Sequence, residues 1–67
     1  MTRKELQDTK LRYRRTARAI IHSEDAHTLI AATCESIALE PCYNHHERGQ
    51  RLWAFFTALE EEKKKYE

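Results

Sequence analysis

The sequence predicts an all-α domain of three short helices, and three observations support this fold class. The 67 residues include one Gly, one Pro and no Val, so the residues on which sheets and their turns depend are nearly absent. Ala, Glu, Lys and Arg, which are good helix formers, are abundant. The net charge of +1 gives little self-repulsion, which disfavours disorder. We therefore expect one helical domain spanning residues 1–67.

The first helix is predicted over residues 2–22. Thr2 and Glu5 have the spacing of a capping box, in which a hydroxyl and a carboxylate satisfy the free amides of a helix start. Apolar residues then recur on one side of a helical wheel, at Leu6, Tyr13, Ala17 and Ile20, with Ile21 at the edge. This side is expected to face the core.

The second helix is predicted over residues 24–39. Ser23 can cap its start, and Glu24 and Asp25 would lie near its positive end. Its apolar face is broader than that of the first helix and contains Ala26, Leu29, Ile30, Thr33, Cys34 and Ile37. The second helix is therefore expected to be the central element.

The third helix is predicted over residues 44–65. Pro41 disfavours helical geometry at Glu40, and a short connector favours antiparallel neighbours. Asn44 and Glu47 repeat the capping arrangement. The expected core residues are Leu52, Phe55, Phe56 and Leu59. The last turns have the spacing for ion pairs from Glu60 to Lys64 and from Glu61 to Lys65, as in a solvated helix end.

The core of this domain is expected to be small. Leu, Ile and Phe together supply only 12 residues. A chain with so few large apolar side chains commonly completes its core by association, so a homodimer is expected.

Charge is distributed unevenly along the chain. Residues 1–22 have a net charge of +5, residues 23–42 have −4, and residues 43–67 are neutral. On a helical wheel the basic residues gather away from the apolar stripe of the first helix and surround a leucine. We call this set the cationic strip: Lys4, Leu11, Arg14, Arg15 and Arg18.

The cationic strip has two functional interpretations and two structural ones. It could bind an acidic groove on a partner protein or neutralise phosphates of a nucleic acid. Alternatively, it is an ordinary solvated face, or it pairs with the acidic second helix of the same domain.

The start of the third helix is the second candidate site. Arg48, Gln50 and Arg51 are residue types that contact base edges, and they follow a bend similar to that of a helix-turn-helix. The connector lacks the glycine often found in such turns, and Glu35 and Glu40 would repel phosphates.

Trp53 lies at the edge of the third apolar stripe, and we expect it to be half-buried. Its ring could join Leu11 or Tyr43 in an exposed apolar patch that binds a partner. The alternative is a core-edge side chain that covers the connector at Tyr43.

Metal binding and catalysis are not expected. Cys34, Cys42, His45 and His46 are candidate zinc ligands, but they lack closely spaced ligand pairs. Cys34 is instead expected to be a small core residue, and a cytosolic setting would keep both thiols reduced. His22 and His27 are interpreted as ordinary helix-end residues. No phosphate-binding loop or catalytic triad spacing occurs, so no cofactor is expected.

These observations favour a small non-enzymatic regulator or adaptor. It would bind a larger partner through the cationic strip and Trp53, with a nucleic-acid-binding module as the alternative. A small inhibitor protein of mobile-element origin is a further alternative, suggested by size alone. No secretory signal or membrane-spanning run is found, so a cytoplasmic protein is expected.

Overall fold

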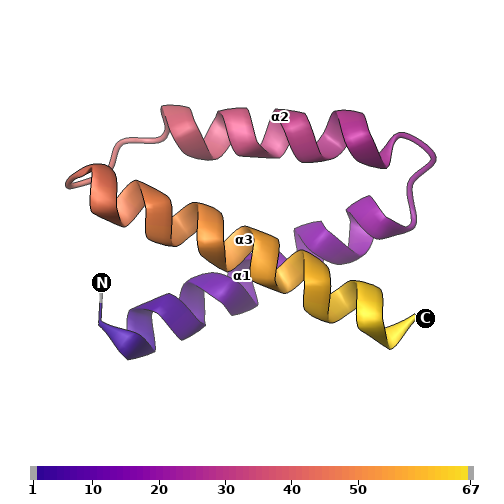
Figure 1. The fold of residues 1–67 in the computed structure, drawn as a ribbon, viewed down its shortest axis with the longest axis horizontal. Helices are drawn as coiled ribbons and strands as arrows, with labels where there is room; N and C mark the ends of the chain where they lie inside the picture. Colours follow the sequence, from indigo (N-terminus) through magenta and orange to yellow (C-terminus); the bar gives the residue numbers. More distant parts are fainter. Residues whose placement is uncertain (1, 67) are drawn as a thin grey trace.

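The computed structural model describes residues 2–66 and contains three helices, α1 (Arg3–Ile21), α2 (Ala26–Leu39) and α3 (His45–Lys65). The predicted all-α class is confirmed, and no strand occurs within residues 2–66. Helices α1 and α3 run in the same general direction and cross, while α2 runs back along one edge (Figure 1). The Cα atoms fill a flat volume of 34 × 23 × 13 Å, so the domain has two broad faces.

Helix α1 begins at the predicted capping residues. The Thr2 hydroxyl oxygen accepts a hydrogen bond from the Glu5 amide at 3.2 Å and donates to the Glu5 carboxylate at 3.1 Å. This cap satisfies one of the free amides of the first turn, as its spacing predicted.

Helix α3 begins in the same way. The Asn44 side-chain oxygen accepts from the Glu47 amide at 2.8 Å, and the Glu47 carboxylate accepts from the Tyr43 amide at 3.2 Å. The Glu47 carboxylate therefore completes the capping box through the amide of Tyr43, the residue before the N-cap Asn44. The predicted start of the third helix is confirmed.

Helix α2 begins two residues later than predicted. The Ser23 amide still donates to the Ile20 carbonyl at 3.0 Å, so the chain has not yet left the last turn of α1. Ser23 accepts from the Asp25 amide at 3.1 Å and thus stabilises the reversal between the helices. Glu24 and Asp25 consequently precede α2 rather than forming its first turn.

The closest packing in the domain joins α1 to α3 rather than either helix to α2. Ala17 of α1 and Ala54 and Ala58 of α3 are completely buried, and their small side chains allow two helix backbones to approach closely. The prediction that the second helix is central is wrong. Helix α2 lies farther away, along the edge of the α1–α3 pair (Figure 1).

The core between the three helices is small. Ile20, Ile37 and Phe55 form its buried cluster, one residue from each helix. Tyr13 packs edge-on against Phe55, with ring centroids 5.8 Å apart. Cys34 contacts the cluster and is partly buried, which confirms its predicted role as a small core residue.

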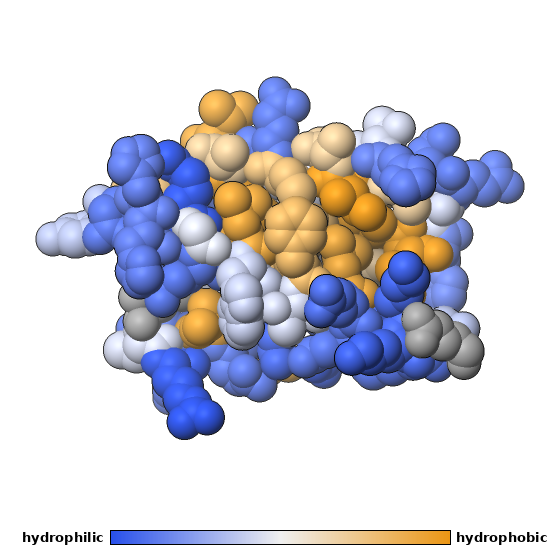
Figure 2. Space-filling model, viewed as in Figure 1, coloured by the Kyte–Doolittle hydropathy of each residue, from blue (hydrophilic) through white to orange (hydrophobic). Residues whose placement is uncertain are grey.

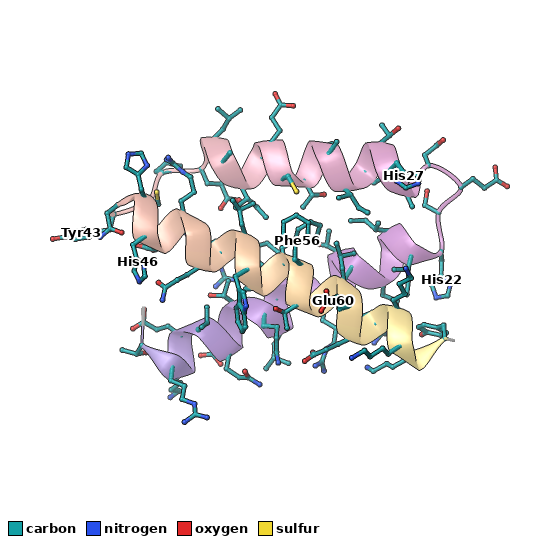
Figure 3. All side chains as sticks on the ribbon, in the orientation of Figure 1. His22, His27, Tyr43, His46, Phe56 and Glu60 are labelled. Carbon is teal, nitrogen blue, oxygen red and sulfur yellow. The ribbon has the colours of Figure 1, made fainter. Side chains whose placement is uncertain are left out.

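The buried side of α3 is rotated from the predicted stripe. Of the four predicted core residues only Phe55 is fully buried, and Phe56 is 46% exposed. The buried set is Ala54, Phe55, Ala58 and Glu62. The rotation arises because α3 places its alanines against α1, which leaves Phe56 directed toward α2 and partly exposed (Figure 3).

Candidate partner-binding face

Three residues of the cationic strip, Lys4, Leu11 and Arg15, lie on the outer surface of α1. Lys4 and Arg15 are exposed, and Leu11 between them is 47% exposed. Lys4 and Leu11 are seven residues apart and Leu11 and Arg15 four apart, so the three lie on one helix face over about 16 Å. Among residues 2–66, neither Lys4 nor Arg15 has an ion-pair partner. Their charges are therefore available to a binding partner.

The other two cations of the strip are held by α3. Arg14 and Arg18 approach the same carboxylate oxygen of Glu62, at 3.6 and 3.5 Å. Lys65 approaches that oxygen at 3.4 Å. Glu62 is completely covered, so the prediction of a solvated helix end is wrong at this position. The cover consists of the long basic side chains that reach it from α1 and from its own helix.

Glu61 adds a second set of ion pairs between α1 and α3. Its carboxylate accepts a hydrogen bond from Lys10 at 3.0 Å and lies 3.5 Å from Arg14. The predicted pairing of Glu61 with Lys65 is therefore replaced by pairing across the helix interface. Similarly, the strip pairs with carboxylates of α3 and not with the acidic second helix, because α3 is the helix packed against α1.

The pKa values of both glutamates reflect these cations. The hydrogen bond from Lys10 lowers the pKa of Glu61, and the charges of Lys10 and Arg14 lower it further. Burial acts to raise the pKa of Glu62, but the hydrogen bonds and charges of Lys65 and Arg18 outweigh it, so that pKa is also lowered. Both carboxylates are thus ionised at neutral pH and fix the orientation of Arg14 and Arg18, which we call the border arginines.

The residues predicted as base contacts lie at the start of α3, but Arg51 is engaged within the domain. Its guanidinium donates to Glu40 at 3.2 Å, to the Pro41 carbonyl at 3.3 Å and to Glu47 at 3.0 Å. These bonds tie the end of α2 to the first turns of α3. Arg51 therefore stabilises the connector instead of projecting toward a ligand.

The environment of Arg51 is a polar cleft between α1 and the α2–α3 connector, which also contains Tyr13 and Arg12. Burial acts to lower the pKa of Arg51, but the hydrogen bond and charge of Glu47 raise it overall. Burial raises the pKa of Tyr13, and the charge of Glu40 adds to that effect.

The two remaining candidates at this helix start differ from Arg51. Arg48 points a guanidinium nitrogen toward His45 Nδ1, 3.4 Å away, while its Nε is buried and has no hydrogen-bond partner among residues 2–66. Gln50 is partly buried. The three side chains are therefore not presented together as one exposed set.

Trp53 is 53% exposed, which confirms the prediction of a half-buried ring. It lies three residues before Phe56, so the two aromatic rings share one side of α3. Tyr43 is 90% exposed and projects from the connector at the end of the domain (Figure 3). Trp53 and Phe56 are therefore both exposed on one side of α3.

The candidate zinc ligands do not assemble. No group of three or more His, Cys, Asp or Glu side chains within residues 2–66 could hold a metal ion. Both thiols are free, and Cys42 donates to the Asn44 carbonyl at 3.3 Å. His22 ends α1 and packs edge-on against Tyr66, with ring centroids 4.6 Å apart, whereas His27 lies in the first turn of α2 (Figure 3).

In the described part of the chain, none of the helices has the length and apolar character needed to cross a membrane. Comparisons with models of protein families, with curated proteins and with solved structures gave no match to this chain.

Proposed function

We propose that this domain is a non-enzymatic regulator or adaptor that binds an acidic surface of a partner protein through the cationic strip of α1. The observation that carries the proposal is an exposed leucine, Leu11, between two cations, Lys4 and Arg15, that have no ion-pair partner among residues 2–66. An apolar anchor flanked by charges is typical of protein interfaces, where the anchor supplies affinity and the charges supply orientation and rate.

The border arginines support the same interface. Arg14 and Arg18 are held by Glu62, and about half of the Arg18 side chain is still exposed. Long side chains normally lose rotamer freedom when they bind, and side chains that are already oriented lose less. The α3 glutamates thus pre-organise one edge of the strip for a partner.

A protein partner is favoured over a nucleic acid by four features. Glu61 and Glu62 neutralise part of the positive charge that would attract phosphates. Arg51, a predicted base contact, is bonded to Glu40 and Glu47. Leu11 adds apolar area that a phosphate backbone cannot use. A domain with a pI of about 7.8 is also less basic than most nucleic-acid-binding domains.

The proposal can be tested by fluorescence anisotropy with two labelled probes, a synthetic amphipathic peptide rich in Glu and Leu and a DNA duplex. The test variant is Lys4→Glu/Arg15→Glu. The matched control is Arg12→Glu/Lys64→Glu, which makes the same change in net charge at exposed cations outside the strip. Leu11→Ser tests the apolar anchor without any change in charge.

The wild type and the control are expected to bind the acidic peptide, with affinity falling as salt rises from about 20 to 200 mM. The strip variant is expected to lose about tenfold or more in affinity, and Leu11→Ser is expected to bind more weakly at every salt concentration. Equal affinities for wild type and strip variant would refute the proposal. Tighter binding to DNA that the strip variant abolishes would establish the nucleic-acid alternative in its place.

A further inference from the structure

A second surface, where α2 and α3 meet near the end of α1, is apolar and exposed. Figure 2 shows the hydrophobic side chains gathered where α2 and α3 meet, and Figure 3 shows Phe56 directed from α3 toward α2. A groove between these helices has a volume of about 230 Å³, and its lining includes the charged residues Glu60 and Lys63. We call the apolar residues of this groove, Ile21, Ile30, Phe56 and Leu59, together with the exposed Trp53 three residues before Phe56, the α2–α3 apolar face.

Gly49 lies on the same side of α3 as this face, at a helix-interior position where glycine is unfavourable. It lies four residues before Trp53 and seven before Phe56, on the same side of α3. Glycine inside a helix is about 1 kcal/mol less favourable than alanine. A Cβ atom at Gly49 would meet nothing within 4 Å, so packing inside the chain does not require a glycine there. A missing side chain beside two exposed aromatic rings fits the close approach of another helix.

The exposed area of the chain indicates how much surface is left to cover. A compact monomer of 8.0 kDa exposes about 4,450 Å². This chain exposes 5112 Å². The difference, about 660 Å², is close to the roughly 800 Å² that each partner contributes to a standard interface.

The radius of gyration supports the same conclusion. It is 11.9 Å, whereas a compact chain of this length has about 10.9 Å. The excess reflects the flat shape, only 13 Å thick between Cα atoms. A second copy packed on one broad face of this flat domain would give a more compact particle.

The charges around the face are compatible with a second copy of the same chain. In a symmetric dimer each surface meets itself, so a strongly charged patch would face like charge. Helix α2 carries a single charged residue, Glu35. At the rim, Glu60 and Lys63 have opposite signs, so a symmetry-related copy can present a complementary charge to each. The cationic strip lacks this property.

We propose that a second copy of this chain packs on the α2–α3 apolar face and forms a symmetric homodimer in which Trp53 and Phe56 are buried. The cationic strips of both copies remain outside this interface. The dimer does not depend on the proposed function, and the substitutions that test the two proposals lie on different helices.

Sedimentation equilibrium from about 5 to 500 µM tests the dimer, because small interfaces commonly associate in the micromolar range. Phe56→Glu places a charge at the centre of the face. Tyr43→Glu is the matched control, since it makes the same type of change at an exposed ring on the connector. Gly49→Gln adds a side chain to the face with a residue that favours helix, so it obstructs the interface while the helix is retained.

The wild type is expected to reach twice its 8.0 kDa mass as concentration rises. The emission of Trp53, the one tryptophan in the chain, is expected to shift to shorter wavelength over the same range. Phe56→Glu and Gly49→Gln are expected to raise the dissociation constant about tenfold or more, and Tyr43→Glu less than about twofold. Circular dichroism will show whether each variant retains its helices. A wild type that stays at 8.0 kDa throughout, or a folded Gly49→Gln variant with unchanged association, would overturn the proposal.

Discussion

Replacement of Ala58 by leucine tests the close packing of α1 against α3. Ala58 is completely buried, and Ala17 and Ala54 are buried with it between the two helices. From sequence alone the substitution is harmless or favourable, because leucine is a good helix former and adds apolar area. In the structure the larger side chain has no space, so the helices must separate or the side chain must adopt a strained rotamer.

Overpacking of this kind typically costs about 1–3 kcal/mol. A chain of 67 residues has a total stability of about 3–10 kcal/mol, so the loss is a large fraction of the whole. Because 1 kcal/mol lowers the Tm of a domain this small by about 4–8 °C, the Tm is expected to fall by about 4–24 °C.

The assay is thermal unfolding followed by circular dichroism at one fixed protein concentration. Ala19→Leu, at an exposed position of α1, is the matched control and is expected to change the Tm by no more than about 2 °C. An Ala58→Leu variant as stable as this control would show that α1 and α3 do not pack through their alanines.

Substitutions at three other residues test the contacts of single side chains. The pKa of Glu62 is lowered from 4.5 in the folded protein, so its ion pairs stabilise the fold above that pH and are lost as pH falls through the lowered value. Glu62→Gln should therefore reduce the acid-induced decrease in Tm. Identical profiles of Tm against pH for the wild type and the variant would contradict this. Arg51→Lys should lower the free energy of unfolding, measured by urea denaturation, by about 1 kcal/mol, since lysine cannot reproduce the guanidinium contacts to both Glu40 and Glu47. An unchanged midpoint of the urea transition would show that these contacts do not stabilise the fold. Asn44→Ala should cost about 1 kcal/mol in the same assay and Asn44→Asp much less, because aspartate can also accept from the Glu47 amide; equal losses would exclude the cap.

The helices and their starts could largely be predicted from the sequence because they depend on neighbouring residues. The caps at Thr2 and Asn44 involve groups three residues away, and the inward face of α1 at Tyr13, Ala17 and Ile20 follows from helical periodicity. The start of α2 could be predicted less accurately from the sequence, because the Ser23 amide is still hydrogen-bonded to the last turn of α1.

The candidate site was only partly predictable for a related reason. The exposure of Lys4, Leu11 and Arg15 follows from the wheel of one helix. The engagement of Arg14 and Arg18 depends on Glu62, which lies in another helix and more than forty residues along the chain. A run of Glu followed by Lys has the same local pattern whether its carboxylates face solvent or a neighbouring helix.

The sequence by itself therefore determined three amphipathic helices and a cationic surface on the first of them, because caps and periodicity act within a few residues. Only the tertiary structure decided which helices approach most closely, since buried alanines are compatible with either a core or a surface position. That choice rotated α3, buried Glu62 under cations from α1, and left Trp53 and Phe56 exposed. These three features depend on packing between segments that are distant in the sequence, and the helix propensity and periodicity of each segment do not determine that packing.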